Sequence, residues 1–180
     1  MDFERVLRFI VSDFSDSGIR YALIGGFAMG ALGIVRATMD LDILVHRDDL
    51  PAVEQILSKR PYRCIYKTEN VSQYVSDTEQ LGQIDILHAF RKISLSMLKR
   101  ARSLPVFEGR FCIPVLAPED IIGLKIQALS NDPARERLEI ADIQRIMEQV
   151  GQDLDWDLLG EYFRLFEKED EYETLKKTYG

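Results

Sequence analysis

The chain has 180 residues and a formal net charge of −7, with 46% hydrophobic and 29% charged residues. These proportions are typical of a globular protein with one core, or with one core and a small helical extension. No apolar run approaches the ~20 residues that a membrane-spanning helix needs. The negative charge argues against a general nucleic-acid binder, which needs a basic surface to neutralise phosphates. It leaves room for a single nucleotide held with a metal ion.

Two features bear on the cellular location. The N-terminal segment MDFERVLRFIVSDF carries Asp2 and Glu4 among its apolar residues and lacks the basic start of a signal peptide, so it predicts an amphipathic helix. Cys64 and Cys112 stand far apart and outside any metal-binding or disulfide spacing. We therefore expect a cytoplasmic protein with no membrane segment.

The hydrophobic pattern predicts helices and strands in a mixed order up to about residue 115. In chain order these are a helix over 2–17, a strand over 21–24, a helix from Gly25 to Leu32, a strand over 39–45, a helix over 51–57, strands over 62–67, 72–76 and 83–88, a helix over 94–101 and a hairpin over 106–115. From Ala117 onward the pattern is helical, over 118–130, 134–149, 155–165 and 168–178. We expect an α/β core over 1–116, with a mixed sheet flanked by helices, and a C-terminal helical region over 117–180 that packs on it.

Three aspartates stand in two of the predicted strands. Asp40 and Asp42 alternate with Leu41 and Ile43, so both carboxylates lie on one face of their strand, and Asp85 alternates in the same way in QIDIL. Neighbouring carboxylates repel each other unless a cation lies between them. Carboxylate oxygens with open positions suit Mg²⁺, which takes the rest of its shell from water and substrate phosphates. The pattern therefore predicts a metal site able to hold two ions.

A glycine pair precedes these acids. Gly25 and Gly26 lie between the first strand and a helix, where a backbone without side chains can approach a phosphate closely. Arg36 and Thr38 follow, just ahead of Asp40, and could reach the same anion.

The run YALIGGFAMGALGIVRATMDLDILV, together with the later QIDILH, resembles the nucleotidyltransferase superfamily with the DNA polymerase β-like fold. The run LAPEDIIGLKIQAL, followed by EIADIQRIM, resembles the helical part of AbiEii-like nucleotidyltransferases, some of which are toxins of toxin–antitoxin pairs. The resemblance spans roughly residues 20–147. Many superfamily members have Gly-Ser where this chain has Gly-Gly, and AbiEii-like members often have Lys-Asp where it has Leu138-Glu139.

The resemblance implies a metal-dependent enzyme that moves a nucleotidyl group from a nucleoside triphosphate such as ATP to a hydroxyl acceptor and releases pyrophosphate. Asp40 and Asp42 would bind two Mg²⁺ ions, with Mn²⁺ as a substitute, and Asp85 would complete the metal site and help to deprotonate the acceptor hydroxyl. Gly25 and Gly26 would hold the triphosphate. The acceptor could be a small molecule, an RNA end or a protein, and a toxin role would imply an antitoxin protein as partner.

The resemblance also places Lys125 against the nucleotide, from the first C-terminal helix, and Asp142 on the second. Read from the residues alone, Lys125 could instead lie on a solvated helix face, and Asp142 could pair with Arg145. For the whole chain, the alternatives are a non-catalytic module that binds a nucleotide or a protein, and a metal-dependent phosphodiesterase that uses the same acids.

Overall fold

The computed structural model describes residues 1–180, which divide into two compact units. Unit 1 comprises Met1–Ala31 and Val35–Leu116. Unit 2 comprises Leu32–Ile34 and Ala117–Gly180. No helix in either unit combines the length and apolar character that a membrane span requires.

Unit 1 is built on one mixed sheet of seven strands in the order β3-β4-β5-β2-β1-β7-β6. Two neighbouring pairs, β2 with β5 and β1 with β7, are parallel, and the other four pairs are antiparallel. Parallel neighbours far apart in the chain bring the acid-bearing strands β2 and β5 to the centre of the sheet. The strands are β1 (Tyr21–Ile24), β2 (Asp40–His46), β3 (Tyr62–Lys67), β4 (Val71–Ser76), β5 (Gln83–Ala89), β6 (Arg102–Val106) and β7 (Phe111–Val115).

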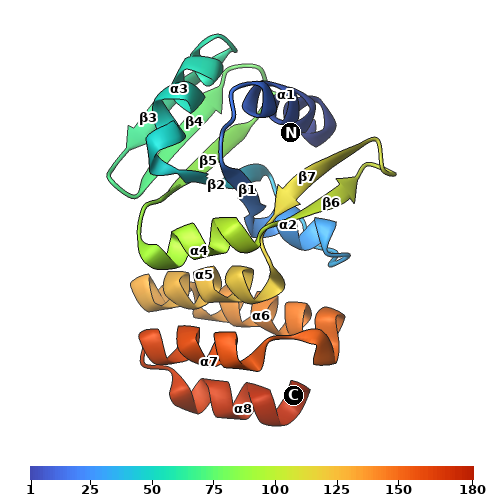
Figure 1. Ribbon diagram of the computed structural model, residues 1–180, viewed down its shortest axis with the longest axis vertical. Coiled ribbons are helices and arrows are strands. Elements are labelled where there is room, and N and C mark those ends of the chain that lie inside the picture. The colour runs from blue at the N-terminus through green and yellow to red at the C-terminus, as the bar shows by residue number, and fades with distance from the viewer. The chain divides into compact units, whose positions relative to one another are not determined.

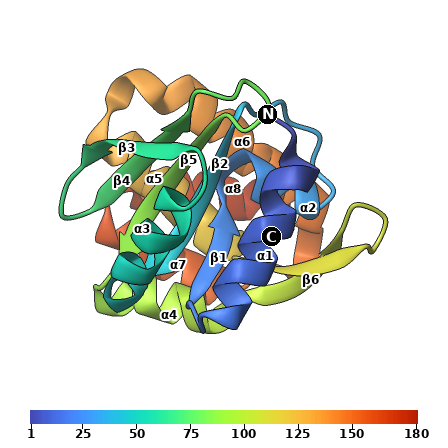
Figure 2. The same ribbon diagram turned by 90° about the horizontal axis from the view of Figure 1, so that it is seen from above.

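Four helices accompany the sheet: α1 (Phe3–Asp16), α2 (Gly25–Ala31), α3 (Leu50–Ser58) and α4 (Lys92–Arg100). Helices α1 and α3 lie on one face of the sheet and α4 on the other (Figures 1 and 2). Helix α1 begins where the Asp2 carboxylate accepts the Arg5 backbone N–H, and it buries Val6, Leu7, Ile10 and Phe14. This apolar stripe covers the sheet face that carries Leu41 and Ile43, so the alternating Asp40 and Asp42 project from the opposite face.

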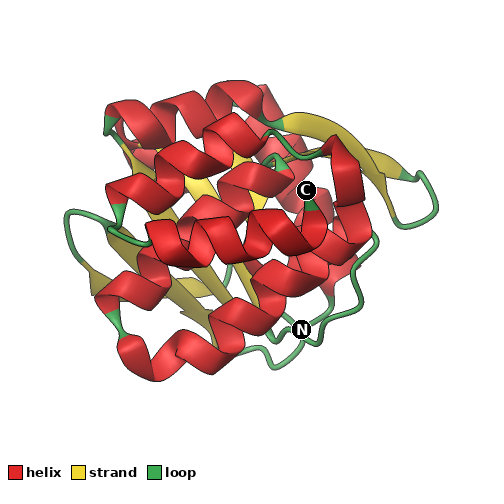
Figure 3. Ribbon diagram, turned by 90° about the horizontal axis from the view of Figure 1, so that it is seen from below, coloured by secondary structure: helices red, strands yellow, loops and turns green.

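Unit 2 contains helices and no strand, as the colouring in Figure 3 shows for the region around the C-terminus. Its helices are α5 (Pro118–Asn131), α6 (Glu136–Val150), α7 (Trp156–Leu165) and α8 (Glu169–Tyr179). Helix α5 packs against α6 and α7, and α7 packs against α8. Pro118 stands in the first turn of α5, where its missing N–H costs nothing, and the Asp155 side chain caps α7.

The predicted mixed α/β architecture with a helical C-terminal region is confirmed. The hairpin departs from the prediction, because β6 begins at Arg102, four residues before the expected start at Val106. The segment Arg-Ser-Leu-Pro lacks the alternation that predicts a strand. It pairs with β7 nonetheless, and β6 is one of the two edge strands, where a proline such as Pro105 is tolerated because one side of the strand has no partner.

Candidate active site

Asp40, Asp42 and Asp85 lie together on one face of the sheet in unit 1. In the parallel pairing of β2 and β5, Asp42 stands directly opposite Asp85 and Asp40 opposite Gln83. Each of the three half-buried aspartates offers a carboxylate oxygen within 4.8 Å of those of the other two. A donor set made only of carboxylate oxygens, this close and partly open to solvent, fits a hard divalent cation such as Mg²⁺ or Mn²⁺.

Neutral side chains orient two of the three carboxylates. The Thr38 hydroxyl donates to Asp40 Oδ1 at 3.0 Å and to the Asp40 carbonyl at 3.1 Å. Gln83 Nε2 donates to Asp85 Oδ1 at 2.7 Å, and Gln73 Nε2 lies 3.3 Å from both Asp85 oxygens. These donors fix the orientation of the carboxylates without adding a cation that would compete with a metal ion.

The glycine pair adjoins the acids because Ile24, the last residue of β1, stands opposite Asp42. Gly25 has φ +66°, and a Cβ built there would collide with the Asp42 carboxylate. A Cβ at Gly26 would collide with the Arg36 guanidinium and would lie 2.7 Å from Thr38 Cβ. The glycines therefore leave room for side chains of the site itself, and they bring Arg36 and Thr38 against the turn that was predicted to hold phosphate.

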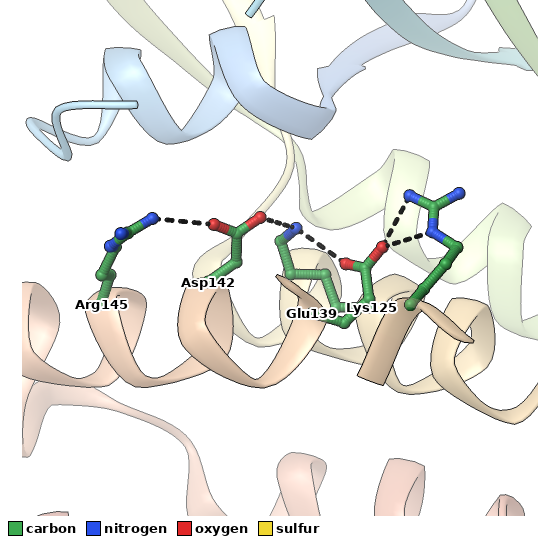
Figure 4. Close-up of polar contacts among 5 residues, drawn as sticks. Lys125, Glu139, Asp142 and Arg145 are labelled. Carbon is green, nitrogen blue, oxygen red and sulfur yellow. Dashed lines mark hydrogen bonds and ion pairs between the residues drawn. The ribbon is translucent and has the colours of Figure 1, made fainter. Parts of the chain in front are cut away.

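Lys125 is buried in unit 2 and paired with two carboxylates. Its ammonium donates to Asp142 Oδ2 at 2.6 Å and to Glu139 Oε2 at 3.1 Å, so it joins α5 to α6 (Figure 4). Arg145 lies 3.3 Å from the other Asp142 oxygen, and Arg135 lies 2.6 Å from the other Glu139 oxygen. Lys125 is thus not on a solvated face, and Asp142 pairs with Lys125 as well as with Arg145.

The two histidines lie at the ends of the acid-bearing strands, His46 as the last residue of β2 and His88 as the next-to-last of β5. His88 is buried, with Nε2 3.0 Å from the Ser72 hydroxyl and Nδ1 2.9 Å from the Glu69 carbonyl. Burial lowers the pKa of His88 below its ordinary value, because the charged ring would lose its hydration. His46 Nδ1 accepts the Asp48 backbone N–H. Both rings have local structural partners, in keeping with their place at strand ends.

Sequence reasoning missed Gln73, Gln83 and Glu139. Gln83 carried a usable signal, because it stands two residues before Asp85 in an alternating strand and therefore shares its face. Gln73 carried none, because only the register of β4 against β5 places it opposite Asp85. Glu139 was noted only as a difference from the AbiEii-like pattern, yet its carboxylate takes part in the pairing of Lys125.

The fold is that of known nucleotidyltransferases. The antibiotic-resistance factor ANT(2″)-Ia matches with a TM-score of 0.68 at 13% identity, over 97% of this chain and 99% of that one. An antigenic nucleotidyltransferase-like protein from Paracoccidioides brasiliensis matches with a TM-score of 0.59 at 17% identity, over 98% of this chain and 92% of that one. The lincosamide adenylyltransferase LnuA, solved with lincomycin, matches with a TM-score of 0.56 at 16% identity, over 79% of this chain and 95% of that one.

The sequence identifies the family to which the chain belongs. Residues 3–168 match the profile of a family described as uncharacterised nucleotidyltransferase, and the chain belongs to this family. It is therefore an enzyme of the nucleotidyltransferase class, as predicted. No curated protein matches it in sequence. The AbiEii-like subtype, the toxin role and the antitoxin partner stay predictions.

Proposed function

We propose that this chain transfers a nucleotidyl group from a nucleoside triphosphate, ATP in the first instance, to a hydroxyl of an acceptor and releases pyrophosphate. The observation that carries the proposal is the trio Asp40, Asp42 and Asp85, whose carboxylate oxygens lie within 4.8 Å of one another beside a glycine turn. Two of the structural relatives support an adenylyl donor and a small-molecule acceptor, since one was solved with adenylyl-2″-tobramycin and another is a lincosamide adenylyltransferase.

The three aspartates would hold the metal, with Asp40 and Asp42 binding two Mg²⁺ ions and Asp85 completing the site. Bound there, the ions would neutralise the triphosphate and the leaving pyrophosphate and would favour ionisation of the acceptor hydroxyl. Mn²⁺, with similar size and oxygen preference, would substitute for Mg²⁺. Thr38 keeps Asp40 in its rotamer, and the two glutamines do the same for Asp85.

The chain's own groups account for the remaining requirements of the transfer. The acceptor oxygen forms a bond to the α-phosphorus while the bond from that phosphorus to the bridging oxygen of pyrophosphate breaks, and Asp85 takes up the hydroxyl proton. Gly25 and Gly26 let the triphosphate approach the backbone beside Asp42, and Arg36 and Thr38, which border Gly26, would contact its oxygens. Lys125 already donates two of its three ammonium hydrogens, to Glu139 and Asp142. It would bind the nucleotide through the third.

The test is calorimetric titration of the protein with ATP, CTP, GTP and UTP, with and without Mg²⁺, followed by assay of pyrophosphate release. We expect metal-dependent binding of at least one nucleotide, and its loss in Asp40→Asn and Asp42→Asn but not in Glu79→Gln, which alters an exposed acid of the same unit. Binding that does not depend on metal would support a non-catalytic nucleotide-binding module instead. Phosphodiester cleavage without use of a triphosphate would support the phosphodiesterase alternative.

A further inference from the structure

We propose that the acceptor binds over the open face of β3 and β4, against Tyr66 and Gln73, and that it is an uncharged or cationic alcohol with a ring, not a polyanion. This inference rests on the proposed function, because it locates the second substrate of the same site. It adds a binding surface and a substrate class that the acids alone do not define.

One cross-strand row links this surface to the acids. Strand pairing sets Tyr66 opposite Gln73, Gln73 opposite Asp85, Asp85 opposite Asp42, and Asp42 opposite Ile24. Residues directly opposite each other on neighbouring strands project from the same face. The row therefore runs across one face from the edge strand β3, through the acids, to the glycine turn that follows Ile24.

The in-line geometry of the reaction indicates which end of the row binds the triphosphate and which end binds the acceptor. In nucleotidyl transfer the attacking oxygen and the leaving pyrophosphate lie roughly in line, on opposite sides of the phosphorus. If the triphosphate lies at Gly25 and Gly26, beside Asp42, the acceptor must approach from the other side of the acids. That side is formed by Asp85, then Gln73, then Tyr66, so the proton-accepting carboxylate faces the acceptor end.

The side chains at this end suit a ring with hydroxyl groups. The Tyr66 side of β3 is open, since Tyr66 is 52% exposed in a strand in which only Tyr62 is buried. An exposed aromatic ring offers a flat apolar face on which a sugar or other ring can stack. Gln73 uses Nε2 to hold Asp85, which leaves its side-chain carbonyl to accept a hydrogen bond from an acceptor hydroxyl.

The charges on β3 argue against a polyanionic acceptor. Arg63 lies 3.5 Å from Asp77, and Lys67 lies 2.7 Å from Glu54, so each cation of the strand already has a carboxylate partner. An RNA end needs cations that are available to replace its counterions. With the acid trio in the same cross-strand row, the surface favours neutral or positively charged molecules.

The experiment is a titration of ¹⁵N-labelled full-length protein, followed by NMR, with methyl α-glucopyranoside, with the aminocyclitol streptamine and with a short single-stranded RNA. Variants Tyr66→Ala and Gln73→Leu test the surface, and Ile65→Ala is the matched control, a neighbouring exposed apolar residue of β3 at the irregular step in its pairing with β4. Titration of the unmodified protein, Tyr66→Ala and Ile65→Ala with Mg²⁺ and ATP reports the nucleotide site separately. Gln73→Leu is left out of this comparison because Gln73 also holds Asp85. Failure of the unmodified protein to bind ATP would contradict the proposed function and not the acceptor surface.

We expect one of the ring alcohols to shift amide resonances of residues 62–67 and 71–76, and its affinity to fall about tenfold in Tyr66→Ala and Gln73→Leu, a usual loss for one stacking or hydrogen-bonding contact. Ile65→Ala should stay within about twofold, and ATP affinity should be unchanged in Tyr66→Ala and Ile65→Ala. The proposal is overturned if neither ring alcohol shifts these resonances at tens of millimolar, if the RNA binds there instead, or if Ile65→Ala weakens binding as much as Tyr66→Ala.

Discussion

The Lys125 ammonium and the Asp142 carboxylate form a buried ion pair of 2.6 Å between α5 and α6. Asp142 is fully buried and Glu139, the second partner of Lys125, is 2% exposed. Two carboxylates withdrawn from water in this way need compensating cations, and among theirs Lys125 alone is buried, since Arg135 and Arg145 are half-exposed. The pair therefore fastens the first two helices of unit 2, whatever else Lys125 does.

We predict that Lys125→Met destabilises the protein by about 3 kcal/mol, because it leaves two buried carboxylates with only a half-exposed arginine each. Arg145→Ala is the control, since its half-exposed guanidinium touches the same Asp142 and its loss should cost about 1 kcal/mol or less. Urea unfolding measures both. A Lys125→Met protein of normal stability with weakened ATP binding would instead place Lys125 among the nucleotide contacts.

The acid site supports a prediction about metal ions. Without metal, three carboxylates held together repel one another, so Asp40→Asn should stabilise the apo protein by about 1 kcal/mol, or about 2–4 °C in melting temperature. The asparagine still offers Oδ1 to the Thr38 hydroxyl. Mg²⁺ should raise the melting temperature of the unmodified protein, EDTA should reverse that rise, and Asp40→Asn should respond to neither. If Glu79→Gln stabilises the apo protein to a similar extent, the effect of Asp40→Asn comes from the change in net charge and not from repulsion within the acid trio.

Local periodicity was enough to predict much of the fold and the acid trio. The alternation around Asp40, Asp42 and Asp85 determines which face each carboxylate occupies, so their common face could be expected before the strand order was known. Gln73 and Tyr66 depend on the pairing of β3 with β4 and of β4 with β5, which local periodicity does not contain. Their part in the row could be seen only from the structure.

Burial of charge was harder to predict. A lysine on an amphipathic helix is usually solvated, and Lys125 departs from this because packing of α6 against α5 brings Glu139 and Asp142 to it. The hydropathy pattern of α5 contains no information on the ion-pair partners that α6 supplies. The glycine pair shows the same limit, since its contact with Asp42 and Arg36 follows from the tertiary arrangement.

The glycine turn supports a paired prediction. Gly25→Ala forces a left-handed φ on alanine and drives a Cβ into the Asp42 carboxylate, so it should cost about 1–3 kcal/mol of stability and abolish the response to Mg²⁺. Gly30→Ala, in the same helix with no atom within 4 Å of the new Cβ, should be neutral or stabilising by up to about 1 kcal/mol. Equal effects of the two substitutions would mean that the turn does not constrain Asp42.

The last prediction concerns the dependence of stability on pH. Because burial lowers the pKa of His88, the folded state favours the neutral ring, while the unfolded chain binds a proton more readily near the ordinary value of about 6.5. The contribution of His88 to stability is therefore complete above about pH 6.5, and it decreases as the pH falls from there toward the lowered pKa, by at most about 1.4 kcal/mol per pH unit. Urea unfolding at several pH values between about 7.5 and 5 should show this loss. His88→Gln should remove it, and His46→Gln should retain it, since the chain has only these two histidines. If His46→Gln removes the dependence instead, the protonated ring that destabilises the fold is His46 and not His88.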